Sequence, residues 1–263
     1  MKTVLIGGGV MGEAILSAAL EQGVIAASDT VVCEKIAERR DELASRFGVE
    51  VTGDAASAVA TGDVVVLAVK PQDLHAVSGT MKPDAFVISV MAGVRMETIR
   101  NVVGHHRIVR AMPNTPVAIK RGMTAWTATT AVTDEQRGFV RSLLAAIGEE
   151  LYLDAESKLD MATAVSGSGP AYVFLFLEAL IDAGVNVGLT RAQAEKLALQ
   201  TVSGATEYAA TSGKSPADLR AMVSSPAGTT VAGTRELERH AFRAAIIDCV
   251  DAAFERAREL GSG

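Results

Sequence analysis

The sequence predicts an α/β fold, in which a Rossmann-type domain is followed by an all-helical domain. Three observations indicate this. A glycine motif follows an apolar run at the start of the chain, and apolar strand-like runs alternate with helical patterns as far as residue 153. After residue 154 only helical patterns remain. Alternation of this kind is typical of a parallel sheet covered by helices. We therefore expect one domain over residues 1–153 and a second over residues 154–263.

The glycine motif is Gly7-x-Gly9-x-x-Gly12, placed between the first apolar run and the first helical pattern. Gly7 permits a tight turn, the absence of a Cβ at Gly9 lets a pyrophosphate approach, and Gly12 allows close helix packing. The unpaired N–H groups of Val10 and Met11 then face the phosphates from the helix start. The order of strand, glycines and helix predicts a dinucleotide site.

Glu34 ends the second predicted strand, 22 positions after Gly12. An acidic residue at this place binds the adenosine ribose 2′-hydroxyl in NAD enzymes. The alternative is a solvated acid at a helix start, which is also favourable. Lys35, Arg39 and Arg40 follow closely and are candidates for attracting a 2′-phosphate. The choice between NADH and NADPH therefore stays open.

Two further segments follow strands of the predicted sheet. Ala68-Val69-Lys70-Pro71 ends the apolar run that begins at Asp63, and Asn114 lies in a loop between two prolines. The carboxyl ends of strands line the ligand crevice of such sheets, so we expect both segments to contact the cofactor. The alternatives are a surface lysine at Lys70 and a purely structural turn at Asn114.

The segment from Ala164 to Tyr172 interrupts an apolar helical pattern with glycines, serines and a proline. Glycines inside a helix cost stability. We therefore expect this segment to face a ligand or to allow close packing.

A loop before the last helices contains Ser225, Ala227, Gly228, Thr229 and Thr230. Its N–H groups and hydroxyls suit a carboxylate held at a helix start. An ordinary Ser/Thr cap is the alternative.

Composition and charge exclude several classes of protein. The net charge is −6 without a basic cluster, which argues against nucleic acid as a partner. Cys33 and Cys249 are far apart, and no zinc-ligand spacing exists, so we expect free thiols and no metal. The most apolar stretch, 171–180, contains Glu178, which argues against a membrane span. Met1 leads straight into the first strand, so no signal peptide is expected and the predicted location is the cytoplasm.

The helical half lacks an obvious general base. Its only histidine, His240, lies among charged residues, and no lysine lies in the glycine- and serine-rich segments. Oxidation of an alcohol needs a base near the carbinol. A protonated imine needs less help, because it is already electrophilic.

Together these residues resemble the Δ1-pyrroline-5-carboxylate reductase family over essentially the whole chain. The most specific motifs are the segments 164–172 and 224–230, supported by 110–116 and 68–71. The resemblance implies hydride transfer from NADPH or NADH to the C=N carbon of the cyclic imine, which gives L-proline in the last step of proline biosynthesis. It also implies that Ser225 and the backbone from Ala227 to Thr230 hold the substrate carboxylate, and that the Thr230 hydroxyl faces the ring nitrogen.

One position departs from the family pattern. The family commonly has Pro-Gly-Gly where this chain has Pro226-Ala227-Gly228. The extra methyl matters only if Ala227 requires a positive φ.

Two rival functions remain at this point. One is another nicotinamide enzyme with the same domain order, such as a 3-hydroxy acid dehydrogenase, which needs a catalytic lysine in the helical half. Lys158, Lys196 and Lys214 are the candidates there. The other is a redox sensor that binds the dinucleotide without catalysis, which turnover of the imine would exclude.

The helical stretch 171–187 is apolar around its whole circumference, so it must be buried on every side. A second copy of the chain is the simplest cover, and we expect an all-helical dimerisation domain. The resemblance agrees, since the family forms dimers with interleaved helical domains and, in some members, a ring of dimers.

Overall fold

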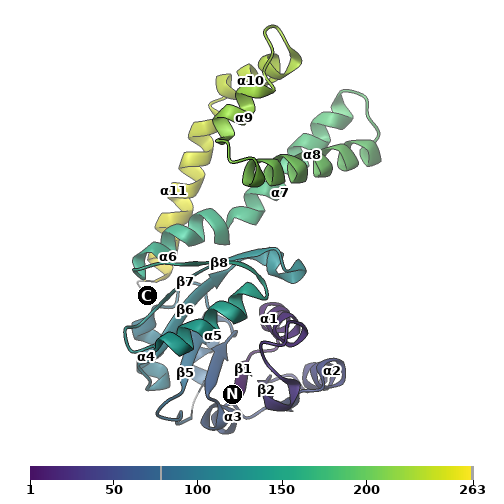
Figure 1. Cartoon of the computed structure of the whole chain (residues 1–263). Helices are drawn as coiled ribbons and strands as arrows, with labels where there is room; N and C mark the ends of the chain where they lie inside the picture. Colours follow the sequence, from purple (N-terminus) through teal and green to yellow (C-terminus); the bar gives the residue numbers. More distant parts are fainter. Residues whose placement is uncertain (78, 262–263) are drawn as a thin grey trace. The chain divides into compact units, whose positions relative to one another are not determined.

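The computed structural model describes residues 1–77 and 79–261 (Figure 1). Two compact units make up the chain. The first comprises residues 1–170 together with 253–263, and the second comprises residues 171–252. The expected functional boundary after residue 153 stays a prediction.

An eight-stranded sheet forms the centre of the first unit, with the order β3-β2-β1-β4-β5-β6-β7-β8. Its strands are β1 Thr3–Ile6, β2 Thr30–Cys33, β3 Glu50–Thr52, β4 Val64–Leu67, β5 Phe86–Ser89, β6 Ile108–Pro113, β7 Gly122–Ala128 and β8 Gly148–Tyr152. Every neighbouring pair is parallel except β6 and β7, which are antiparallel. The strands β1, β2, β4 and β5 are buried along their whole length, as expected of central parallel strands.

Helices connect these strands. The α-helices are α1 Val10–Glu21, α2 Ala37–Phe47, α3 Ala55–Thr61, α4 Met96–Val103, α5 Asp134–Ala145 and α6 Ser157–Ala162. Three 3₁₀ segments, η1 Ala27–Asp29, η2 Pro71–Ala76 and η3 Thr115–Ile119, and one π-helical segment, η4 Thr163–Gly167, complete the unit. Asp54 caps α3, and Thr133 and Gln136 form the predicted capping box of α5.

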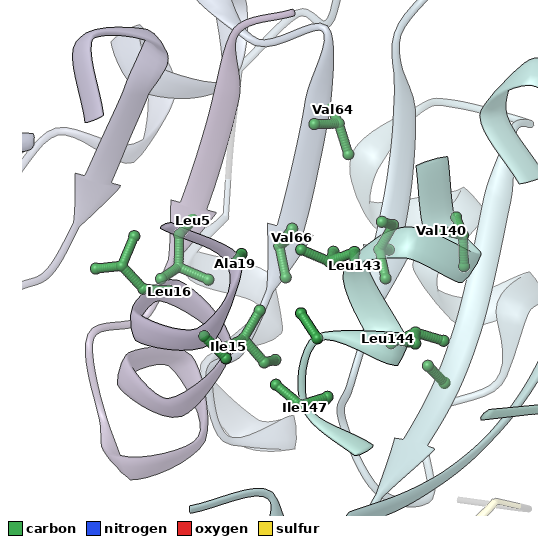
Figure 2. Packing of buried hydrophobic residues seen from close by; sticks show 14 of the residues in the cluster. Leu5, Ile15, Leu16, Ala19, Val64, Val66, Val140, Leu143, Leu144 and Ile147 are labelled. Carbon is green, nitrogen blue, oxygen red and sulfur yellow. The ribbon is translucent and has the colours of Figure 1, made fainter. Parts of the chain in front are cut away.

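Apolar side chains pack on both faces of the sheet in two clusters. Figure 2 shows one of them, in which Leu5 and Val66 of the sheet lie near Ile15 of α1 and Leu143 of α5. Burial on both faces is the pattern expected of a parallel sheet covered by helices.

The second unit is helical, and residues 171–252, all of which the structure describes, contain no strand. Its helices are α7 Gly169–Asn186, α8 Arg191–Thr211, α9 Pro216–Met222, α10 Thr229–Arg239 and α11 Phe242–Leu260, of which the ends of α7 and α11 belong to the first unit. Thr190 with Gln193 caps α8, and Ser215 caps α9. The predicted fold class, Rossmann-type followed by all-helical, is confirmed.

The apolar side chains of α7 are exposed in the single chain. Leu175 is 68% exposed and Phe174 is 56% exposed. The continuous helical stretch 157–186 is long and apolar enough to cross a membrane by length and composition, and 6% of its most apolar window is buried. A surface of this kind requires a cover that the single chain does not supply.

Candidate functional site

A cleft lies at the carboxyl ends of β1, β2 and β4, with a volume of about 420 Å³. Its lining includes the glycine turn and the segments after β2, β3 and β4, namely Ile6, Gly7, Gly9, Cys33, Glu34, Lys35, Ile36, Gly53, Ala55, Ala68, Val69, Lys70, Asp73, Ala76 and Val77. The cleft lies where the strand order reverses about β1, which is the ligand-binding place of open α/β sheets. Burial, followed by the Glu34 carboxylate, raises the pKa of the Cys33 thiol there.

The glycine turn has the geometry that the motif predicts. Gly7 has φ +103°, and a Cβ there would lie 2.7 Å from the Ala68 carbonyl oxygen. A Cβ at Gly12 would overlap the Gly7 carbonyl oxygen. At Gly9, by contrast, a Cβ would meet no atom within 4 Å, so this position borders open space. The first and last glycines thus shape the turn, and Gly9 leaves room for a ligand.

The N-terminus of α1 faces this turn with free donors. Gly9 is the N-cap and supplies no side chain, and the first helical hydrogen bond runs from Glu13 N to Gly9 O at 2.8 Å. Helix geometry therefore leaves the N–H groups of Val10, Met11 and Gly12 without an intrahelical acceptor. A turn without Cβ atoms and a helix start with free N–H groups together fit a dinucleotide pyrophosphate.

Glu34 holds the turn after β2 in place. Its Oε2 accepts from Gly8 N at 2.9 Å, and its Oε1 accepts from Ile36 N at 3.0 Å. These two hydrogen bonds fix the carboxylate in the wall of the cleft, where a ribose hydroxyl would meet a preset acceptor. The position agrees with the predicted ribose contact, which remains a prediction.

The nearby cations are already engaged. Arg39 donates from Nε to Gly8 O at 2.9 Å and forms ion pairs with Glu13 and Glu42. Arg40 donates from Nη1 to the backbone oxygen of Glu34 at 2.8 Å. Lys35 and Asp73 also line the cleft, and the exposed Nζ of Lys35 lies 3.5 Å from Asp73 Oδ1.

The segment after β4 lies where the sequence predicts it. Ala68, Val69 and Lys70 line the cleft, and Pro71 begins η2 next to it. Lys70 is exposed and serves as the N-cap residue of η2 without a side-chain cap hydrogen bond.

Asn114 lies at the end of β6, and its side-chain amide is fully engaged within the protein. Its Oδ1 accepts from Met123 N at 2.9 Å, and its Nδ2 lies 3.2 Å from Ser166 O and 3.4 Å from Ser166 Oγ. It is not part of the lining of the cleft. The predicted cofactor contact of this residue stays a prediction.

Sequence reasoning missed a buried ionic cluster beside the segment 164–172. Arg110 of β6 donates from Nη1 to Glu156 Oε1 at 3.0 Å, and its Nη2 lies 3.6 Å from Asp160 Oδ1. The Nη2 of Arg95 lies 2.9 Å from Asp160 Oδ2. Glu156 also accepts from Met96 N at 2.7 Å. The available signal is an arginine inside an otherwise apolar strand, because a buried charge requires a partner.

The loop between α9 and α10 lies in the second unit. Ala227 has φ +56°, so the position where the family commonly has glycine does require the left-handed region. A Cβ at Gly228 would overlap Ser225 Oγ. The loop therefore brings the Ser225 hydroxyl directly against Gly228, the N-cap residue of α10.

Helix α10 also begins with free donors. Gly228 is its N-cap without a side-chain hydrogen bond, and the first helical bond runs from Ala232 N to Gly228 O at 3.2 Å. The N–H groups of Thr229, Thr230 and Val231 consequently have no intrahelical acceptor. Such donors suit an anionic group. The predicted roles of Ser225 and Thr230 toward a carboxylate stay predictions.

Comparison with known protein families accounts for both units. Residues 156–260 match the family described as pyrroline-5-carboxylate reductase dimerisation, and residues 2–93 match the family described as NADP oxidoreductase, coenzyme F420-dependent. The helical part of this chain is therefore a dimerisation domain, and the sheet part is a nucleotide-binding domain of an oxidoreductase.

Relatives that match over nearly their whole length are named pyrroline-5-carboxylate reductase. The pyrroline-5-carboxylate reductase of Synechocystis sp. is 44% identical over 260 residues, which cover 98% of this chain and 97% of the relative. Among solved structures, the pyrroline-5-carboxylate reductase from Coxiella burnetii has a TM-score of 0.91 at 36% identity, covering 98% of each chain. The Plasmodium falciparum pyrroline carboxylate reductase with NADP bound has a TM-score of 0.87 at 29% identity, covering 99% of this chain and 98% of that one. This chain belongs to the pyrroline-5-carboxylate reductase family of NAD(P)H-dependent oxidoreductases.

Proposed function

We propose that this chain reduces the cyclic imine 1-pyrroline-5-carboxylate to L-proline, with Thr230 and Ser225 as the residues that contact the substrate. The observation that carries this assignment is the start of α10, where N–H groups without an intrahelical acceptor lie beside the Ser225 hydroxyl, in a segment 224–231 that contains no lysine or histidine. A site with donors for a carboxylate and no strong base suits an imine better than an alcohol.

The cleft of the first unit holds the cofactor. The N–H groups of Val10, Met11 and Gly12 bind the pyrophosphate over Gly7 and Gly9, and Glu34 accepts from the adenosine ribose. Ala68, Val69 and Lys70 also line the cleft. When bound, the reduced nicotinamide supplies the hydride that the imine carbon accepts.

The loop before α10 holds the substrate. The N–H groups of Thr229 and Thr230, with the Ser225 hydroxyl, bind the carboxylate, where the positive end of the helix dipole also favours an anion. Ala227 and Gly228 set the path of the backbone around it. The Thr230 hydroxyl orients or protonates the ring nitrogen, which ends the reaction as an amine.

The dimerisation domain provides the cover for the exposed apolar helices, and a second copy of the chain is the occupant. Dimers of this chain assemble further into a ring, and the enzyme works in the cytoplasm. The ring rests on the resemblance to the family, and the location rests on the expected absence of a signal peptide.

The test follows the absorbance of NADPH and of NADH with pyrroline-5-carboxylate as the substrate. Wild-type protein should oxidise at least one cofactor in an imine-dependent manner and release proline. Thr230→Ala should lower kcat by about 10²–10³, the cost of one positioned hydrogen bond in a dry site. Thr211→Ala is the matched control, because its hydroxyl bonds within α8 to Glu207 O.

The outcomes separate the rival functions. If the wild-type protein binds NADPH but never oxidises it with the imine, it is a dinucleotide sensor or a dehydrogenase of another substrate. Lys158→Ala, Lys196→Ala and Lys214→Ala then test the dehydrogenase, which requires one of these lysines. Near-normal kcat in Thr230→Ala would remove this hydroxyl from the mechanism.

A further inference from the structure

The π-helical turn η4 ends three residues before Pro170. In an α-helix the carbonyl of Ser166 accepts from the N–H of residue 170, but Pro170 has no N–H. The chain widens here instead, and Ser168 N donates to Thr163 O, five residues earlier, at 2.8 Å. The carbonyl of Ser166 consequently lacks the donor that an α-helix would supply at residue 170, and a donor from another part of the fold can take its place.

Asn114 supplies that donor. Its Nδ2 donates to Ser166 O at 3.2 Å, across 52 positions of the sequence. The orientation of the amide is fixed from the other side, because Oδ1 accepts from Met123 N at 2.9 Å in β7. One side chain at the end of β6 therefore joins the start of β7 to the π-turn.

Asn114 is the last of three contacts along one side of β6. Arg110, Met112 and Asn114 alternate along the chain, so all three lie on the same face of the strand. Arg110 binds Glu156 and Asp160 before the π-turn, and a Cβ at Gly167 would lie 3.0 Å from the terminal methyl group of Met112. The strand and Asn114 thus contact the segment 156–167 at Glu156, at Asp160 and again at the π-turn.

We propose that Asn114 is a positioning residue for the imine reduction, which fixes the π-turn Thr163–Gly167 at the carboxyl end of β6. This proposal rests on the proposed function. Because β6 runs parallel to β5, its carboxyl end belongs to the sheet edge at which such folds bind ligands. Asn114 then acts through the placement of Ser166 and Gly167 at that edge, and it does not itself contact the cofactor.

The experiment uses the full-length chain and three readouts: kcat and KM for pyrroline-5-carboxylate, the Kd for NADPH by nucleotide fluorescence, and the thermal unfolding midpoint without ligands. Asn114→Ala should lower kcat by about a hundredfold, which is the cost of a misplacement of about 1 Å. Its Kd for NADPH should stay within about threefold of wild type, because the pyrophosphate site is untouched. Asn101→Ala, an exposed asparagine of α4, is the matched control and should leave all three readouts unchanged.

A double variant separates positioning from simple stabilisation. Asn114→Ala/Pro170→Ala restores an N–H at residue 170, so the Ser166 carbonyl regains a helical donor and the π-turn can close to an α-helix. We expect the unfolding midpoint to recover in this variant while kcat stays low.

Two results would overturn the proposal. Recovery of both kcat and the midpoint in the double variant would show that Asn114 only satisfies a carbonyl group. A rise of the Kd for NADPH as large as the fall in kcat of Asn114→Ala would make Asn114 a direct cofactor ligand. Failure of the wild-type chain to reduce the imine is a different result, and it would reject the proposed function itself.

Discussion

Ala227 is a strained residue in the loop before α10, for which we propose a substrate-binding role, and its replacement by glycine is a quantitative test of that strain. Its φ is +56°, in the left-handed region that costs a residue with a Cβ about 1–2 kcal/mol. Glycine removes this cost, but its greater conformational entropy also stabilises the unfolded chain by about 0.4–1 kcal/mol. Ala227→Gly should therefore stabilise the folded protein by a net of about 0.5–1 kcal/mol. For a chain of this size the unfolding midpoint should rise by about 1–4 °C.

Ala241 is the matched control, because it has φ +54° at the other end of α10. Thermal unfolding of Ala227→Gly, Ala241→Gly and the wild type at one protein concentration compares the two sites directly. Both substitutions should raise the midpoint by similar amounts. Only Ala227→Gly should change the KM for the imine, since it loosens the loop that presents Ser225 and Thr230.

A lower midpoint for Ala227→Gly beside a higher one for Ala241→Gly would refute the reasoning. The methyl group of Ala227 would then contribute more by packing in the dimer than its backbone loses by strain. An unchanged KM with a raised midpoint would leave the strain argument intact and remove Ala227 from substrate binding.

The remaining predictions concern the sheet unit. Gly9→Val should lose NADPH binding but keep the unfolding midpoint of the wild type, because a Cβ at Gly9 meets no protein atom. Gly12→Ala should lower the unfolding midpoint, because its Cβ overlaps the Gly7 carbonyl oxygen. Equal midpoints of the two variants would contradict this reasoning. Glu34→Gln should raise the NADPH/NADH ratio of kcat/KM at least about fivefold, since unit charges 4 Å apart repel by about 1 kcal/mol even in water; an unmoved ratio makes Glu34 only a support for Gly8. Burial lowers the pKa of His105, so its folded form resists protonation and stability should fall as the pH drops from about 6.5 through the folded pKa. Unfolding midpoints between pH 7.5 and 5 should show this slope, and His105→Gln should flatten it.

The sheet unit was predictable because local signals and global packing agree there. Asp54 precedes a short helical pattern and caps it, and Thr133 with Gln136 forms the capping box that the spacing predicts. Uninterrupted β-branched runs became strands buried on both faces. The helix α4 was not predicted, since its N-cap is Arg95, which makes no side-chain cap hydrogen bond and so gives no start signal like that of Asp54 before α3.

Sequence reasoning could propose parts of the candidate site only where their signal is local in sequence. The glycine motif and the loop before α10 are continuous segments, so their residue types indicate their chemistry. The contact of Asn114 with Ser166 joins residues 52 positions apart, and no local pattern connects them. One signal was available, because Pro170 inside a helical pattern implies an unsatisfied carbonyl at Ser166. The sequence says that a donor is needed there, and only the fold says which residue provides it.

The helical unit shows the limit of reasoning from one chain. Its apolar stretch 157–186 satisfies the length and composition of a membrane span. Charge decides against that reading, because α7 carries Glu178 and Asp182 within the stretch, and Asp182 forms a 2.9 Å ion pair with Arg191, a pair that is exposed to water. An ion pair in lipid would lose the solvation that makes such exposed pairs inexpensive. The exposed leucines and phenylalanines of α7 therefore require a protein cover, and the dimerisation domain supplies it with a second copy. The stability of this unit then depends on protein concentration, because folding and association bury the same apolar faces.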